Sequence, residues 1–177
     1  MNTPIYDFLT QYSSSDTLRC HMPGHKGRSF SGAMHELSRL DITEIKGADS
    51  LFEADGIIAQ SERNMASLYG SAAAAYSAGG STLCIQAMLA IMKQEGRTVY
   101  AVRNVHRAFL NAAALLGIEV EWIMPEYSVV ILSGRIGPET VRRAMSGSKN
   151  AALYVTSPDY TGRIADIAAL AEVCHDI

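Results

Sequence analysis

A glycine-containing turn at residues 76–82, with the sequence YSAGGST, constrains the fold more than any other stretch of this chain. A run of four alanines precedes it at residues 72–75, and the residues after it carry apolar side chains at helical spacing. These apolar positions are Ile85, Met88, Leu89 and Met92. The pattern predicts a strand, a tight turn and a helix whose N-cap is Ser81 or Thr82.

The start of that helix is a candidate anion site. The first N–H groups of a helix have no partner within it, and the helix dipole is positive there. Two glycines followed by two hydroxyls therefore favour a bound phosphate. The same residues would also be explained by a turn and a helix cap without any ligand.

Composition narrows the class of protein. The chain has 177 residues, of which 48% are hydrophobic, and a formal net charge of -3. One soluble globular domain is the first expectation, and no basic surface indicates nucleic-acid binding. No apolar run reaches the roughly 20 residues of a membrane span, and the N-terminus lacks the features of a signal peptide. We therefore expect a cytoplasmic protein without a membrane interaction.

The three cysteines, Cys20, Cys84 and Cys174, are widely separated and form no C-x-x-C pair. This spacing predicts neither a disulfide framework nor a zinc site, and we expect buried thiols. His21 and His25 lie in a loop whose proline and glycine exclude a helix, which also disfavours a zinc site. That loop could bind an acidic or phosphorylated ligand, or be purely structural.

Upstream of the turn, the N-terminal helix carries Ile5, Phe8, Leu9 and Tyr12 on one face. Residues 40–45 alternate like a strand, and Asp55 is the expected cap of a helix that ends at Gly70. Residues 72–76 lie between two glycines and are too few for an ordinary helix, so we expect a buried strand there.

Downstream of the turn, strands alternate with helices. Residues 98–102, 118–123 and 151–156 have strand composition. His106 lies where the first of these strands gives way to a helix, and helices are also expected after Gly137 and after Asp166. The alternation predicts an α/β protein with three α/β/α layers and a mostly parallel sheet, which binds ligands at strand C-termini.

Five segments together resemble the pyridoxal-phosphate-dependent ornithine/lysine/arginine decarboxylases, which have fold type I. They are HMPGHKG at 21–27, DITEIKGADSLFEADGII at 41–58, AGGST at 78–82, RNVH at 103–106 and TSPDYTG at 156–162. The resemblance is to the N-terminal part of the major domain. It implies an arm and active-site-mouth loop at 1–50, and the front part of an incomplete fold type I large domain at 51–177.

The resemblance also implies a cofactor site. Gly80, Ser81 and Thr82 would hold the phosphate of pyridoxal 5'-phosphate (PLP), His106 would stack on its pyridine ring, and Ser157 would lie near its phenolic oxygen. A basic amino acid is the implied substrate and a homodimer or larger oligomer the implied assembly. No metal is implied.

The chain also departs from the family pattern. Gly79 stands where many members have asparagine, and Arg107-Ala108 where Lys-Ser is frequent. The family's aspartate at the pyridine nitrogen and its Ser-x-His-Lys lysine would come after Ile177, so no catalytic residue is expected here. We expect the chain alone to be inactive and to bind PLP weakly and non-covalently. Another fold type I enzyme, an aminotransferase or lyase, and a non-catalytic phosphate-ligand module are the alternatives, although RNVH and HMPGHKG favour the decarboxylases.

The resemblance finally implies a strand order. Only the strands at 98–102 and 118–123 are expected to remain neighbours, which would leave other strand edges unpaired. We therefore expect the chain to pair such edges with another copy or to rearrange its strands.

Overall fold

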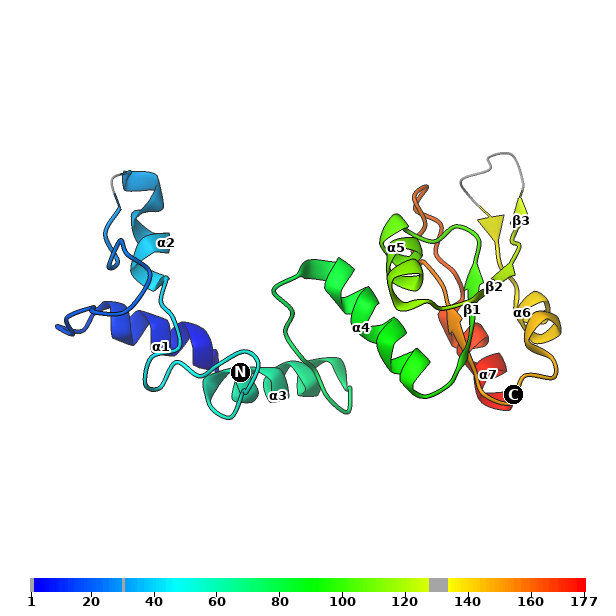
Figure 1. Cartoon of the computed structure of the whole chain (residues 1–177), viewed down its shortest axis with the longest axis horizontal. Coiled ribbons are helices and arrows are strands. Elements are labelled where there is room, and N and C mark those ends of the chain that lie inside the picture. Colours follow the sequence, from blue (N-terminus) through cyan, green and yellow to red (C-terminus); the bar gives the residue numbers. More distant parts are fainter. Residues whose placement is uncertain (1, 30, 128–133) are drawn as a thin grey trace. The chain divides into compact units, whose positions relative to one another are not determined.

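The computed structural model describes residues 2–29, 31–127 and 134–177. The backbone forms two compact units, Met1–Tyr76 and Ser77–Ile177, which are described separately (Figure 1). The predicted division between residues 50 and 51 concerns the organisation of the family's domain and stays a prediction.

The described part of the first unit is helical. Helix α1 (Pro4–Ser13) begins with a proline at its first turn, which is pre-set for helical φ. A short 3-10 turn, η1 (Gly32–Met34), leads into α2 (His35–Leu40), and α3 (Ile57–Tyr69) follows. Helix α3 ends at Gly70, whose left-handed φ of 63° confirms the predicted C-cap.

Two predicted strands of the first unit are wrong. Residues 40–45 do not form a strand, because the N–H of Ile45 bonds to the carbonyl of Thr43 and the N–H of Ala48 to that of Ile45. These local bonds fold the backbone into turns. Residues 72–76 are also irregular: the N–H of Tyr76 donates to the Glu62 carboxylate of α3 at 2.9 Å. A run of alanines buries too little surface to hold an extended segment in a core.

The N-terminus of α3 is capped by Asp49 and not by Asp55. The Asp49 carboxylate accepts hydrogen bonds from the N–H groups of Gly56 and Ile58 at 2.9 and 2.8 Å. Asp55 contributes only its own backbone N–H, which also bonds to Asp49. The loop between the two aspartates therefore folds back on Asp49. The sequence pattern did not predict this fold of the loop.

The second unit contains a parallel sheet of β1 (Thr98–Val102), β2 (Val120–Ile123) and β5 (Ala151–Tyr154), in the order β2-β1-β5. All three were predicted, two of them with longer bounds. As expected, β1 and β2 are neighbours, but β5 also pairs with β1, Thr98 lying opposite Ala151. The strands are therefore rearranged relative to the order that the resemblance implies, which was one of the two expected outcomes. The connection from β2 through α6 returns the chain to the other side of β1.

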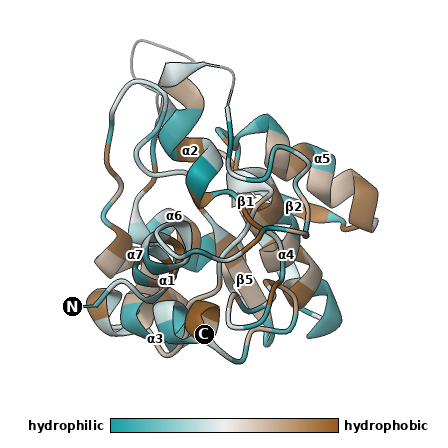
Figure 2. Ribbon diagram, turned by 90° about the vertical axis from the view of Figure 1, so that its left-hand side faces the viewer, coloured by the Kyte–Doolittle hydropathy of each residue, from teal (hydrophilic) through white to brown (hydrophobic). Residues whose placement is uncertain are grey.

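Helices cover both faces of this sheet, which confirms the predicted α/β/α layers (Figure 2). Helices α4 (Gly80–Gln94) and α5 (Arg107–Leu116) cover one face, and α6 (Pro138–Met145) and α7 (Ile167–Asp176) the other. Side chains of β1 alternate between the layers, with Val99 and Ala101 against Phe109 and with Tyr100 on the opposite face. Strands β3 (Glu126–Tyr127) and β4 (Gly134–Arg135) pair with each other in a separate, antiparallel two-stranded sheet.

Candidate functional site

The predicted phosphate turn forms the start of α4. The helix begins at Gly80 with Gly79 as its N-cap, and no side chain caps it. The expected cap by Ser81 or Thr82 is therefore wrong, because both residues already lie within the first helical turn. Gly80 has a φ of 64°, a left-handed value that favours glycine.

The backbone at this turn offers free donors. Gly79 donates its N–H to the Ser77 hydroxyl, and Leu83 donates to the Gly79 carbonyl. Within the described part of the chain, the N–H groups of Gly80, Ser81 and Thr82 have no hydrogen-bond partner, and all three residues are exposed. Adjacent N–H groups at a helix N-terminus bind anions, so this turn fits a phosphate group.

Position 79 requires glycine because the side chain of Leu83 lies close to its Cα. A Cβ added at Gly79 would lie 2.6 Å from the Cβ of Leu83. Any larger residue, including the asparagine that many relatives have here, would force the turn to shift. A Cβ at Gly80 would meet no atom within 4 Å, so there only the positive φ demands glycine.

His106 is the N-cap of α5 and confirms the predicted junction of strand and helix. Its Nδ1 accepts a hydrogen bond from the N–H of Ala108 at 3.1 Å. In the neutral imidazole the proton therefore lies on Nε2, and the ring orientation is fixed. The ring is exposed, whereas Ala108 is buried. An exposed ring held by its backbone could stack on a planar group.

Ser157 lies in the loop after β5. Its hydroxyl accepts a hydrogen bond from the N–H of Ala165 at 3.1 Å, which ties the two ends of the loop together. The nearby Asp159 is buried, and its Oδ1 accepts bonds from the N–H groups of Thr161 and Arg163. Asp159 was not singled out from the sequence, although an aspartate directly after a proline is a common turn signal.

Two of the predicted cofactor residues, His106 and Ser157, lie at the C-terminal edge of the sheet, because they follow β1 and β5. Helix α4 leads into β1 through a turn at Gly96. No hydrogen bond or cavity of the described residues joins its first turn to His106 or Ser157. A cavity of about 280 Å³ opens at this edge and is lined by residues that include Asn104, Thr156 and Asp166. None of the predicted cofactor residues lines that cavity.

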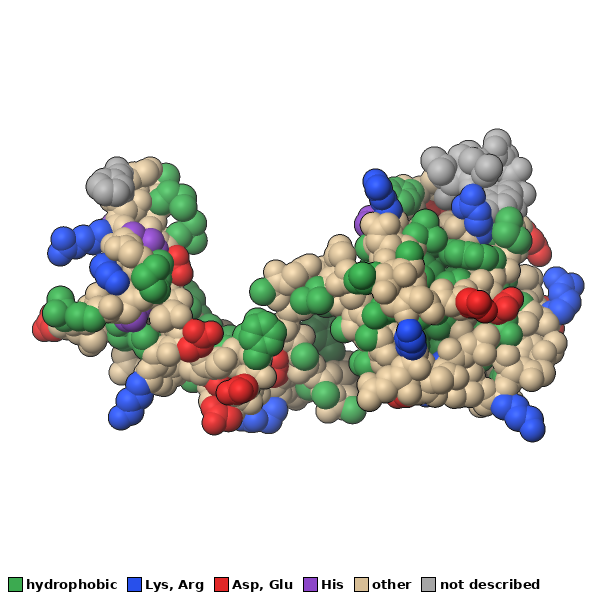
Figure 3. All heavy atoms as spheres, viewed as in Figure 1, with side chains coloured by type: hydrophobic (Ala, Val, Ile, Leu, Met, Phe, Trp, Pro, Cys, Tyr) green, Lys and Arg blue, Asp and Glu red, His purple; other side chains and the backbone are tan. Residues whose placement is uncertain are grey.

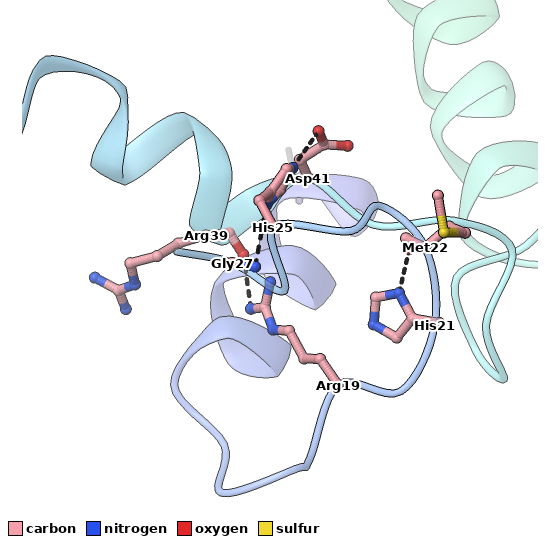
Figure 4. Close-up of polar contacts among 7 residues, drawn as sticks. All are labelled: Arg19, His21, Met22, His25, Gly27, Arg39 and Asp41. Carbon is pink, nitrogen blue, oxygen red and sulfur yellow. Dashed lines mark hydrogen bonds and ion pairs between the residues drawn. The ribbon is translucent and has the colours of Figure 1, made fainter. Parts of the chain in front are cut away.

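The histidine loop at residues 21–27 is held by hydrogen bonds that use both ring nitrogens of each histidine. Figure 4 shows three of them, from His21 to Met22 and from His25 to Gly27 and Asp41. His21 donates from Nδ1 to the carbonyl of Met22 and accepts at Nε2 from the Tyr12 hydroxyl at 2.8 Å. His25 accepts at Nδ1 from the N–H of Gly27 and donates from Nε2 to Asp41, both at 3.1 Å. In their neutral forms the two rings are therefore opposite tautomers.

The Arg19 side chain packs against the same loop. Its guanidinium lies 5.0 Å from the centre of the Tyr12 ring and donates from Nη2 to the carbonyl of Arg39 at 2.7 Å. A Cβ at Gly27 would lie 2.5 Å from Nη1 of Arg19, so a glycine is needed at that position. This packing favours the structural interpretation of the loop.

Other site classes find little support among the described residues. They contain no group of three or more His, Cys, Asp or Glu side chains placed to hold a metal. The three cysteines are free, but Cys20 and Cys84 are exposed, so the expectation of buried thiols is wrong for both. Burial raises the pKa of the Cys174 thiol. None of the described helices has the length and apolar character needed to span a membrane.

Comparison with known proteins identifies the family. Residues 3–177 match the family model "Orn/Lys/Arg decarboxylase, major domain". The chain is 29% identical over 182 residues to "Uncharacterized protein YaaO" of Bacillus subtilis, and 26% identical over 183 residues to "Arginine decarboxylase" of Bacillus cereus. These alignments cover 99% and 98% of this chain but only 38% and 39% of the relatives' lengths.

Among solved structures, mouse CSAD superposes with a TM-score of 0.45 at 16% identity, over 96% of this chain and 45% of that one. This likeness is too low to support an argument about function. The match over residues 3–177 carries the assignment instead, and it agrees with the parallel α/β/α layers of the second unit. The chain belongs to the Orn/Lys/Arg decarboxylase family, within its major domain.

Proposed function

We propose that this chain provides the phosphate-binding and ring-binding part of a PLP-dependent decarboxylase that acts on a basic amino acid. The observation that carries the proposal is the turn at Gly80, Ser81 and Thr82, whose N–H groups find no partner among the described residues. In the proposed site the turn would act together with the ring of His106, which is exposed and follows the C-terminal end of β1.

Each residue has a role that follows from its position. The N–H groups and hydroxyls at the start of α4 bind the phosphate, with help from the helix dipole. His106 presents the face of a ring whose Nδ1 is already bonded to Ala108. Ser157, in the loop after β5, would contact the phenolic oxygen of the cofactor through its hydroxyl. PLP, when bound, supplies an electron sink for the electrons released when the carboxylate leaves.

The covalent anchor of the cofactor has no candidate in these 177 residues. Lys26 follows a histidine, but Pro23 stands where the family's Ser-x-His-Lys motif has serine. The Lys26 ammonium also donates to the carbonyl of His21. The three other lysines, Lys46, Lys93 and Lys149, have no such context. We infer that the chain by itself binds PLP non-covalently and does not turn over substrate.

The substrate class follows from the family and its named relatives. The proteins of Bacillus cereus and Bacillus anthracis are called arginine decarboxylases, so arginine is the first substrate to test, followed by lysine and ornithine. We propose a cytoplasmic homodimer or larger oligomer for the complete enzyme. Both points concern a whole protein, of which this chain matches about two-fifths.

The test of the site compares PLP binding by the parent and by the Ser81→Ala, Thr82→Ala double variant, measured by calorimetry. Neither hydroxyl caps α4, so stability should change by less than about 0.5 kcal/mol. PLP affinity should fall by about tenfold or more, since hydrogen bonds to a charged group are worth about 1.5–3 kcal/mol. Thr140→Ala is the control, because it removes a hydroxyl from the first turn of α6.

Other outcomes would contradict the proposal. Equal PLP affinity in the double variant and the control would contradict the proposed phosphate contacts of the Ser81 and Thr82 hydroxyls. Binding of inorganic phosphate as tight as that of PLP, with no effect of His106→Asn, would favour a non-catalytic phosphate module. Decarboxylation of arginine by the chain alone, with a borohydride-reducible adduct at one lysine, would show that the covalent anchor is present after all.

A further inference from the structure

The loop that connects β5 to α7, residues 155–166, is closed on itself by hydrogen bonds at two levels. At the inner level, the N–H of Asp159 bonds to the carbonyl of Arg163 at 2.9 Å. At the outer level, the N–H of Ala165 donates to the Ser157 hydroxyl at 3.1 Å. The outer closure holds Ser157 in position, and it encloses the inner one along the chain.

The Asp159 carboxylate is the main side-chain acceptor inside this loop. Asp159 is 8% exposed and is the only buried residue with a charged or polar side chain in the part of the chain that the structure describes. Figure 3 shows acidic side chains, in red, at the surface, where water solvates them. The Asp159 Oδ1 instead accepts from the N–H and the hydroxyl of Thr161, both at 2.8 Å, and from the N–H of Arg163 at 2.9 Å. A buried carboxylate needs such donors, so the fold of the loop and the position of Asp159 depend on each other.

The bond from Ala165 determines which role is left to the Ser157 hydroxyl. A serine hydroxyl has one proton to donate and two lone pairs that accept. The N–H of Ala165 occupies one of these lone pairs. No residue that the structure describes accepts the hydroxyl proton, and Ser157 is partly exposed. The hydroxyl is therefore held in place and still has its proton to donate to a ligand.

The two levels of closure are connected along the backbone. Asp159 follows Ser157 by two residues, and Arg163 precedes Ala165 by two residues. The bonds between Asp159 and Arg163 therefore bring the two ends of the loop together. Without them, the single bond between Ala165 and Ser157 would have to offset the conformational entropy of the whole intervening segment.

We propose that Asp159 is a positioning residue for the cofactor, because it holds the Ser157 hydroxyl where it donates to the phenolic oxygen of PLP. The inference rests on the proposed function, in which Ser157 contacts that oxygen. A donated hydrogen bond favours the ionised form of a phenolic oxygen, and a donor that is already fixed loses little entropy on binding. Asp159 itself is buried and bonded within the loop, so it acts only through Ser157.

A double-mutant cycle in PLP affinity separates this role from simple stabilisation of the loop. Calorimetry on the 177-residue chain should give Ser157→Ala and Asp159→Ala a similar loss of affinity, of about tenfold. The double variant should bind PLP no more weakly than Ser157→Ala alone, because Asp159 then has nothing left to position. Asp176→Ala is the control for charge, since it removes one exposed carboxylate at the last turn of α7 and should leave PLP affinity unchanged.

Amide hydrogen exchange in the absence of PLP tests the structural step. In the parent, the N–H groups of Ala165 and Arg163 should both be protected. Ser157→Ala should lose protection only at Ala165, whereas Asp159→Ala should lose it at both residues. If Asp159→Ala does not fold, Thr161→Val takes its place, because it removes one donor to Asp159 and should lower PLP affinity by about twofold. That smaller effect should also disappear in the Ser157→Ala background.

Two results would overturn the inference and leave the proposed function intact. One is an unchanged PLP affinity in Asp159→Ala together with a loss in Ser157→Ala. The other is a further loss from Asp159→Ala in the Ser157→Ala background, which would mean that Asp159 acts on its own. The proposed function is tested separately at Ser81 and Thr82, so its failure would appear as an unchanged affinity in that double variant. Equal affinity in the parent and Ser157→Ala would overturn both this inference and the proposed role of Ser157.

Discussion

The Asp49 carboxylate lies 2.8 Å from the amide nitrogen of Ile58 and caps a helix that begins eight residues after it. The same side chain accepts from the N–H groups of Ser50, Asp55 and Gly56. Asp49 itself has a φ of 70°, which only a few non-glycine residues adopt. One side chain thus holds both the loop at residues 50–56 and the start of α3.

This arrangement predicts how stability depends on pH. Desolvation alone would raise the pKa of Asp49, but the hydrogen bonds from the backbone of Asp55, Ser50, Gly56 and Ile58 outweigh it and lower the pKa below its usual value. Stability from Asp49 should be fully present above the unfolded-state pKa of about 3.9 and decline as pH falls toward the folded-state pKa. Acid unfolding of the parent and of Asp49→Asn checks this, because the variant should lose that part of the pH dependence.

The contact of Gly79 with Leu83 predicts non-additive variants. Gly79→Ala should destabilise the chain by about 1–3 kcal/mol, because its Cβ would overlap that of Leu83. Leu83→Ala alone should cost little, since Leu83 is 44% exposed. Leu83→Gly should restore part of the stability lost in Gly79→Ala, as measured by urea unfolding in a double-mutant cycle. Additive effects would show that the turn relaxes without meeting this side chain.

His106 serves as a helix cap, which can be separated from its proposed contact with the cofactor. His106→Ala should reduce stability by about 1 kcal/mol, whereas His106→Asn should be nearly neutral because asparagine is a good N-cap. Both variants should weaken PLP binding, since neither provides a ring. If His106→Asn binds PLP as well as the parent does, the ring contact is absent and only the cap remains.

The core of the second unit depends on Phe109. Its side chain is fully buried, and its ring centre lies 4.3 Å from that of Tyr154 and 6.2 Å from that of Trp122. Phe109→Ala should cost about 3–5 kcal/mol in chemical unfolding. The adjacent Leu110 is 46% exposed, so Leu110→Ala should change stability by less than about 0.5 kcal/mol. Similar costs for the two variants would contradict the proposed core.

Local signals in the sequence predicted the second unit better than the first. The helix starts after Gly137 and Asp166 lie where expected, because such a signal needs only residues within one turn. The residue that caps α3 was predicted wrongly because it is Asp49, eight residues before the helix. Its left-handed backbone conformation cannot be predicted from a sequence pattern. Residues 72–76 were missed because Tyr76 is held by side chains of α3, Glu62 and Ser61, and not by a neighbouring strand.

The candidate site was partly predictable for the same reason. A glycine turn and a histidine after a strand are local features, so Gly80 could be placed at the start of a helix and His106 at the end of a strand from sequence. The position of β5 beside β1 and the packing of Leu83 on Gly79 depend on contacts through space. Local sequence patterns do not encode such contacts, so the particular strand order could not be predicted from them.

The opposite tautomers of His21 and His25 have a consequence for any ligand of their loop. Each ring nitrogen that lacks a proton already accepts a hydrogen bond, from Tyr12 in one case and from Gly27 in the other. A metal ion or an acidic proton that approached either lone pair would have to displace that donor first. Binding there would be an exchange of one partner for another, so its net free energy would be only the difference between the two.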